Sequence, residues 1–199
     1  MENSIITDKQ AAYLKGDSTT QQLLYIVHTI RTNWANHKLT QGLFLDVSAA
    51  FDKVWQKALV AKLNQIGVDG TFLNTISTYL SDRKQVVVDD GVKSDVLNVE
   101  AGVPQGSRLG PLLFIIYMND ITNDLESYIL IFADDTSLLA SGNDPVETAA
   151  MLNRDLIKIT DWATKRKVTF NKGKSKDVIF SKKVLNNSPF RLILETTEA

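Results

Sequence analysis

The sequence contains no cysteine. This absence excludes disulfide bonds, thiolate metal sites and cysteine nucleophiles, and it suits an intracellular protein. Long hydrophobic runs are also missing, since the longest, residues 112–118, is far shorter than the about 20 residues of a membrane-spanning helix. The first ten residues carry charge and lack the apolar stretch of a signal peptide. We therefore expect an intracellular protein without a membrane segment, and the sequence does not decide between nucleus and cytoplasm.

A strong excess of either charge is missing too, because 22 Lys and Arg residues face 23 Asp and Glu residues, a net charge of −1. This balance argues against a nucleic-acid-binding surface over the whole chain. The charges are nevertheless unevenly spread, and eight basic residues crowd the stretch 165–183 with only Asp177 opposing them. A lysine run is usually a solvated face, although a basic segment beside an acidic centre also suits a phosphate-handling metal site. Both interpretations stay open on charge alone.

The length of 199 residues leaves room for one core, alone or with a small appendage, and apolar periodicity predicts alternating helices and strands. Helices are expected at 18–30, 51–66 closed by Gly67, 71–80, 112–118 and 144–162. Strands are expected at 42–47, 85–88, 95–99, 128–133, 136–140, 168–170 and 178–180. The segment 89–91 is a hairpin turn signal, and the glycine- and proline-rich segment 101–111 is expected to be a loop. A clear hairpin among alternating elements favours a mixed α+β fold over a purely parallel sheet.

Two adjacent carboxylates, Asp134 and Asp135, lie between strongly apolar segments. We expect them at the tip of a buried hairpin, where like charges repel each other and a bound cation would neutralise them. An isolated pair of aspartates in a turn is structural in most proteins, because aspartate favours turns.

Asp46 ends another apolar strand just before the next predicted helix. If that strand lies beside the 128–140 hairpin, Asp46 and Asp134 converge in an all-oxygen, anionic group that suits Mg²⁺ or Mn²⁺ rather than zinc. The alternative for Asp46 is a charge that interacts with the dipole of the following helix. The two histidines, His28 and His37, show no spacing typical of metal ligands.

The loop 101–111 is a third candidate, since its three glycines would let the backbone approach a ligand closely. Gln105 could donate hydrogen bonds to a sugar or base, and Arg108 could contact phosphate. Alone, such a segment is most often an ordinary loop.

Taken in order, three stretches resemble motifs A, B and C of reverse transcriptases, and their residues are those typical of the non-LTR (LINE-type) retrotransposon branch. They are Phe44-Leu-Asp46-Val-Ser-Ala-Ala-Phe51-Asp-Lys-Val, Gly102-Val-Pro-Gln-Gly-Ser-Arg-Leu-Gly-Pro-Leu-Leu-Phe114 and Phe132-Ala-Asp-Asp135. Upstream, residues 10–19 resemble that branch's segment between fingers and palm, and downstream Asn171-Lys-Gly-Lys174-Ser resembles motif D. The resemblance covers nearly the whole chain.

The resemblance implies a catalytic centre with two Mg²⁺ ions, or Mn²⁺ in their place. Asp46 and Asp134 would be the principal ligands, Asp135 a supporting carboxylate and the carbonyl of Val47 a further ligand. Successive strand residues point to opposite faces, so Asp134 and Asp135 are not expected to reach the metals equally. Lys174 stands where the family has a lysine suited to protonating pyrophosphate, and its alternative is a solvated surface lysine.

The resemblance also implies contacts to the substrates. The ring of Phe51 would occupy the space of a ribose 2′-OH and so select deoxynucleotides, although its spacing equally fits a core aromatic residue. Gln105 and Gly106 would lie under the incoming nucleotide and the template, with Arg108 near phosphate. The expected partners are an RNA template, a DNA primer and a deoxynucleoside triphosphate, and the expected activity is RNA-templated DNA synthesis.

The implied fold is a polymerase palm, a ferredoxin/RRM-like antiparallel sheet backed by helices, with a remnant of fingers and no thumb. Residues 1–40 would connect fingers and palm, 41–185 would form the palm, and 186–199 would begin a connection to a thumb. The fingers, thumb and endonuclease regions are expected in a longer parent protein.

Two other functions stay open. One is a catalytically silent palm remnant that only folds or binds nucleic acid. The other is a related two-metal nucleotidyl transferase of the retron, group II intron or RNA-templated RNA polymerase type. Phe51 and the LINE-like sequence of the 102–114 stretch argue against the RNA polymerase.

Overall fold

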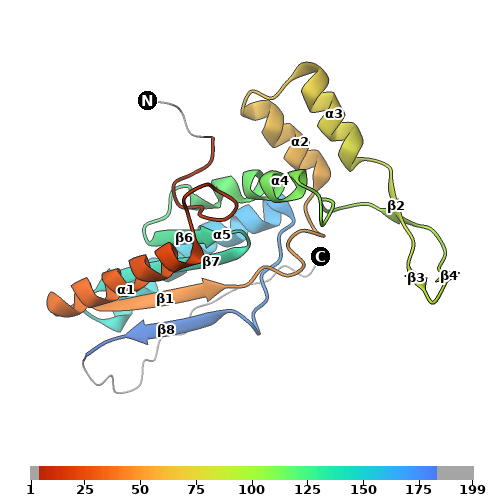
Figure 1. The fold of residues 1–199 in the computed structure, drawn as a ribbon. Helices are drawn as coiled ribbons and strands as arrows, with labels where there is room; N and C mark the ends of the chain where they lie inside the picture. Colours follow the sequence, from red (N-terminus) through yellow and green to blue (C-terminus); the bar gives the residue numbers. More distant parts are fainter. Residues whose placement is uncertain (1–4, 183–199) are drawn as a thin grey trace. The chain divides into compact units, whose positions relative to one another are not determined.

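The structure is a computed structural model that describes residues 5–182. The chain divides into two compact units (Figure 1). The first unit combines Met1–Ser48 with Met118–Ala199, and the second is Ala49–Tyr117. Among the described residues, no helix is both long and apolar enough to cross a membrane.

A four-stranded antiparallel sheet forms the centre of the first unit. Its strands lie in the order β6 (Tyr128–Phe132), β7 (Asp135–Gly142), β1 (Leu39–Leu45) and β8 (Lys176–Phe180). The α+β fold predicted from the sequence, with an antiparallel sheet, is confirmed here. The strand expected at 168–170 is wrong, because only an isolated bridge between Val47 and Phe170 forms there.

Helices α1 (Thr19–Ala35) and α5 (Pro145–Arg166) cover opposite faces of this sheet. Neighbouring residues of β1 show this, because Asn33 of α1 donates to the hydroxyl of Thr40, whereas the Thr148 hydroxyl of α5 donates to the Gln41 side chain. Adjacent strand residues point to opposite faces. Figure 1 shows α1 running alongside β1.

The starts of both helices follow from their capping residues. The Ser18 hydroxyl accepts the N–H of Gln21, and the Asp144 carboxylate accepts the N–H groups of Val146 and Glu147. Helix α5 buries one apolar stripe, comprising Ala149, Leu152, Leu156, Ile159 and Ala163. The sequence predicted both helices.

The apolar face predicted for α1 is only partly buried. Ile30 is enclosed, but Leu23 and Leu24 are exposed by 61% and 62%. Asn33 of this helix donates hydrogen bonds to the hydroxyls of Thr40 and Ser141 in the sheet.

The second unit contains α2 (Gln56–Gln65), α3 (Gly70–Leu80) and α4 (Leu109–Met118). The helix predicted from Phe51 begins only at Gln56, because Ala49 adopts a left-handed φ of 49° and the chain turns there before the helix starts. Gly67, at a φ of 93°, ends α2 as predicted.

A ribbon follows α3 in the second unit. Strands β2 (Arg83–Gln85) and β5 (Leu97–Val99) form its base, and β3 (Val88–Asp89) and β4 (Val92–Lys93) form its tip. The predicted turn is confirmed at Asp90 and Gly91, which have φ values of 45° and 81°. The strand predicted at 85–88 is interrupted between β2 and β3, where the Ser94 hydroxyl accepts the N–H of Val87, and the strand predicted at 95–99 forms only at Leu97–Val99.

The loop predicted at 101–111 ends three residues early, since α4 already begins at Leu109. Pro111 lies in the first turn of this helix, where a missing N–H costs nothing.

Candidate active site

Asp134 and Asp135 lie at the tip of the β6–β7 hairpin, as the apolar flanks predict. Ala133, directly before them, is buried and adopts a left-handed φ of 57°. Asp134 occupies the turn and is half-buried, whereas Asp135 is exposed and begins β7. The turn therefore places two consecutive carboxylates in different surroundings.

Asp46 lies at the same end of the sheet. Leu45, the last residue of β1, is paired with Thr136, so Asp46 directly follows β1 at the end of the sheet where Asp135 begins β7. Burial raises the pKa of the Asp134 carboxyl, a hydrogen bond to its own backbone opposes the rise, and the charges of Asp135 and Asp46 add to it. The structure thus brings Asp46 and Asp134 close enough for their charges to interact.

The donor chemistry of this group fits a hard divalent cation. All its side-chain ligand atoms are carboxylate oxygens, which Mg²⁺ and Mn²⁺ prefer, and a cation would relieve the repulsion felt by Asp134. Within residues 5–182, however, no three acidic or histidine side chains already form a group that could hold a metal. The ligand roles of Asp46, Val47, Asp134 and Asp135 stay predictions.

Lys174 belongs to the same end of the first unit. Its Nζ lies 3.9 Å from Oδ2 of Asp46, and its side chain is 70% exposed. The backbone holds this segment in place, because the N–H of Asp46 donates to the Ser175 hydroxyl and its carbonyl accepts the N–H of Asn171. Sequence-distant motifs A and D are therefore adjacent.

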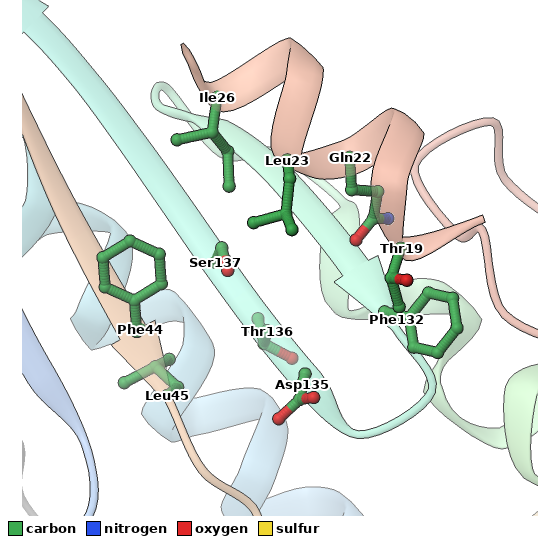
Figure 2. Close-up of a pocket in the computed structure, with 10 residues that line it drawn as sticks. All are labelled: Thr19, Gln22, Leu23, Ile26, Phe44, Leu45, Phe132, Asp135, Thr136 and Ser137. Carbon is green, nitrogen blue, oxygen red and sulfur yellow. The ribbon is translucent and has the colours of Figure 1, made fainter. Parts of the chain in front are cut away.

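A cavity of about 310 Å³ opens between α1 and the sheet beside Asp135 (Figure 2). Figure 2 shows Leu23 and Ile26 extending from α1 toward β7, with Gln22 beside the end of β6. Asp135 lines this cavity, whereas Asp134 does not. The sequence does not predict this cavity, because the apolar spacing of α1 does not reveal how closely the helix packs on the sheet.

The predicted substrate-contacting residues lie in the second unit. The ring of Phe51 stacks on Phe114, with centroids 4.4 Å apart and an angle of 20° between planes. The side-chain amide of Gln105 donates to the Asp52 carboxylate at 2.7 Å. Gly106 has a φ of 76° with open space where a side chain would stand, and Arg108 is exposed. Their substrate roles stay predictions.

Gly102 explains how the segment around Phe51 and the 101–111 loop come together within this unit. A Cβ at Gly102 would lie 2.8 Å from the backbone oxygen of Asp52, and its φ is 85°. Its N–H donates to the carbonyl of Val54, and the N–H of Val103 donates to the carbonyl of Phe51. Only glycine permits this approach at this conformation.

Residues 1–191 match the family model described as reverse transcriptase (RNA-dependent DNA polymerase). The chain is 31% identical over 184 residues to the probable RNA-directed DNA polymerase from transposon X-element of Drosophila melanogaster, covering 90% of this chain and 20% of that protein. It is 33% identical over 171 residues to the RNA-directed DNA polymerase from mobile element jockey of Drosophila funebris, covering 82% and 19%.

Among solved structures, telomerase from Candida tropicalis in complex with a fragment of telomeric RNA superposes with a TM-score of 0.63. The identity is 14%, over 95% of this chain and 34% of the telomerase chain, so this likeness concerns the fold alone. The chain spans about a fifth of the length of the curated relatives it matches. The resemblance inferred from motifs A, B and C is confirmed, and the chain belongs to the reverse transcriptase (RNA-dependent DNA polymerase) family as a domain of the non-LTR, LINE type.

Proposed function

We propose that this chain is the palm of an RNA-directed DNA polymerase, which joins deoxynucleotides to a primer 3′-hydroxyl on an RNA template. The observation that carries the proposal is the mutual proximity of Asp46 and Asp134. Leu45 pairs with Thr136, so Asp46 and Asp134 lie at the same end of the sheet although 87 intervening residues separate them in the sequence. Repelling carboxylates at one end of a buried sheet are what a cation-dependent phosphoryl transfer requires. The family membership and the relatives' names support the same activity.

The proposed division of labour starts from the carboxylates. Asp46 and Asp134, with the carbonyl of Val47, hold two Mg²⁺ ions, and Asp135 adds negative charge nearby. When bound, the ions lower the pKa of the attacking 3′-hydroxyl and stabilise the pyrophosphate leaving group. Lys174, at 3.9 Å from Asp46, donates a proton to the pyrophosphate.

The second unit supplies the proposed substrate contacts. Phe51 excludes a ribose 2′-OH, and its stacking on Phe114 supports a fixed ring position. Gln105 and Gly106 lie under the nucleotide and template, and the bond from Gln105 to Asp52 supports a defined loop conformation. Arg108 contacts phosphate from an exposed position.

We further propose that residues 1–40 connect fingers and palm, that 41–185 form the palm, and that the chain includes part of the fingers. The stretch 186–199, proposed to begin a connection to a thumb, lies outside the described residues. Fingers, thumb and endonuclease regions are proposed for a longer parent protein, of which this chain would be one module.

Primer extension on poly(rA)/oligo(dT) with Mg²⁺ tests the activity. We expect Asp46→Asn and Asp134→Asn each to lower extension by roughly a hundredfold or more, because each removes a ligand charge at the reacting phosphate. Asp161→Asn, on the exposed side of α5, is the matched control and should leave extension unchanged. Extension that survives both site substitutions would contradict the proposal.

The second candidate is a palm remnant that binds nucleic acid without chemistry. It is favoured by the finding that, over the described part of the chain, no three acidic or histidine side chains lie close enough together to hold a metal ion. Template–primer binding without any extension in Mg²⁺ or Mn²⁺ would support this candidate against the first.

A further inference from the structure

The segment before α1 runs beside the strand that leads to the candidate site. The N–H of Ala11 donates to the carbonyl of Ile131 at 3.0 Å, and the N–H of Ile131 donates to the carbonyl of Lys9 at 2.9 Å. Gln10 and Ile131 thereby form a parallel bridge along β6, on the edge of the sheet away from β7. The last residues of β6 are thus held from both sides.

The side chain of Gln10 reaches beyond this pairing to the hairpin turn. Gln10 is 2% exposed, and its Oε1 accepts the N–H groups of Ala12 at 2.8 Å and of Ala133 at 3.1 Å. Ala133 is itself buried, so without Gln10 its N–H would lack this acceptor inside the protein. One glutamine oxygen therefore joins the N-terminal segment to the residue that precedes Asp134.

The backbone at Ala133 needs such support. Its φ of 57° lies in the left-handed region, which is unfavourable for any residue with a Cβ. Residues held in such conformations persist where their surroundings fix them, and they cluster at functional sites. A change of φ at Ala133 would reorient the peptide that follows and move the Asp134 carboxylate.

Gln22 adds a second contact from α1. Its Nε2 donates to the carbonyl of Ile131 at 2.6 Å, the same carbonyl that accepts from Ala11. Gln22 and Gln10 therefore hold Ile131 and Ala133, the residues on either side of Phe132. Nothing in the proposed chemistry itself uses either side chain.

We propose that Gln10 is a positioning residue, which holds Ala133 in its left-handed conformation and so presents the Asp134 carboxylate toward Asp46 for divalent cation binding. This inference rests on the proposed function, because Gln10 would act by positioning Asp134 in the proposed cation site. Gln22 supports the same strand from the side of α1.

The decisive comparison is between two buried glutamines of the first unit. Gln10→Leu removes the acceptor for Ala133, while Gln41→Leu removes bonds to Thr148 of α5 and Asp177 of β8, away from the turn. Both glutamines are nearly inaccessible, at 2% and 1% exposure, so both variants leave buried polar groups unsatisfied. Gln41→Leu thus controls for a general loss of stability.

The first measurement is Mn²⁺ binding to the full chain, followed by the electron paramagnetic resonance signal of free Mn²⁺. We expect Gln10→Leu to weaken binding about tenfold, roughly the effect of one lost buried hydrogen bond, and Gln41→Leu to change it by about twofold or less. The second measurement is amide hydrogen exchange, in which the Ala133 amide should exchange faster in Gln10→Leu and not in Gln41→Leu.

A rescue variant separates positioning from folding. Glycine adopts a positive φ without the penalty of a Cβ, so Ala133→Gly in the Gln10→Leu background should recover part of the lost Mn²⁺ affinity. A purely structural role for Gln10 predicts no recovery, because the N-terminal segment would still lack its bond.

The outcomes keep the two proposals apart. If Asp134→Asn abolishes Mn²⁺ binding while Gln10→Leu behaves like Gln41→Leu, the positioning role is overturned and the cation site stands. If Asp134→Asn leaves Mn²⁺ binding unchanged, or the parent chain binds no Mn²⁺, the cation site and the role of Gln10 are both overturned.

Discussion

The ammonium of Lys174 lies 3.9 Å from Oδ2 of Asp46, in the position of a counter-ion for a carboxylate proposed to bind metal. A lysine and a divalent cation would then compete for the same oxygen. The pair is largely solvated, with side chains 70% and 34% exposed, so their mutual attraction is weak. Lys174 should therefore affect two properties that can be measured separately, the affinity for a divalent cation and the rate of primer extension.

We predict that Lys174→Gln tightens Mn²⁺ binding and slows primer extension. Removing a nearby positive charge should raise cation affinity about two- to fivefold, the range expected for an exposed ion pair. The loss of a proton donor for pyrophosphate should lower the extension rate at saturating Mn²⁺. Lys172→Gln, on the same exposed segment, is the control for general charge effects. Unchanged affinity and rate would show that Lys174 is a solvated surface residue.

A second prediction concerns Gly102 and Gly106, which share a positive φ but differ in their surroundings. Gly106→Ala should cost about 1–2 kcal/mol of unfolding free energy, because alanine is strained at a φ of 76° and meets no neighbour. Gly102→Ala should cost about 1–3 kcal/mol more, because its Cβ would lie 2.8 Å from the Asp52 oxygen. Urea denaturation of both variants measures the difference. Equal costs would show that the loop moves away from Asp52 easily.

The sequence predicted elements whose signals are local. Ser18 and Asp144 cap α1 and α5, and Gly67 closes α2, because each of these residues acts within one helical turn. The late start of α2 escaped prediction, since the apolar spacing of 51–66 begins inside the turn at 49–53 and gives no sign of it. Strand order and register depend on contacts between distant segments, which apolar spacing does not encode.

The sequence predicted the carboxylates of the candidate site but not the buried residue that holds them in place. Aspartates after apolar strands, together with three motifs in order, singled out Asp46 and Asp134, which the structure brings together. Gln10 begins the 10–19 stretch that resembles the segment between fingers and palm, but that resemblance gave it no role, and a glutamine outside any periodic segment looks like a surface residue. Its burial depends on pairing with Ile131, which lies more than a hundred residues away.

A third prediction concerns Phe51, for which the sequence left a substrate contact and a core position open. Its stacking on Phe114 supports a structural contribution, so Phe51→Ala should lower unfolding free energy by about 1–3 kcal/mol. If the ring also excludes a 2′-OH, the same variant should incorporate ribonucleotides more readily relative to deoxynucleotides. Phe72→Ala, an exposed phenylalanine of α3, should change neither property. Lost stability with unchanged sugar selectivity would leave only the core role.

The fourth prediction uses Asp177, which accepts hydrogen bonds from the buried amide of Gln41 at 2.9 and 3.0 Å. Burial raises the pKa of the Asp177 carboxyl, and the bond from Gln41 offsets only part of that rise. The folded state therefore holds this proton more tightly than the unfolded state does. The resulting stability is complete below the ordinary aspartate value of 3.8 and is lost as pH rises through the higher folded pKa.

Asp177→Asn should consequently stabilise the protein at pH 7, because it removes a carboxylate that is costly to ionise while its amide oxygen still accepts from Gln41. The gain should be small, about 0.5 kcal/mol or less, because the carboxyl is only partly buried, most of the residue stays in contact with solvent, and its charge is screened. It should shrink to nothing below pH 3.8, where the parent carboxyl is already protonated. Urea denaturation across this pH range, with Asp161→Asn as the exposed control, measures the effect. A variant that is less stable than the parent at pH 7 would show that the bond from Gln41 outweighs the cost of burial.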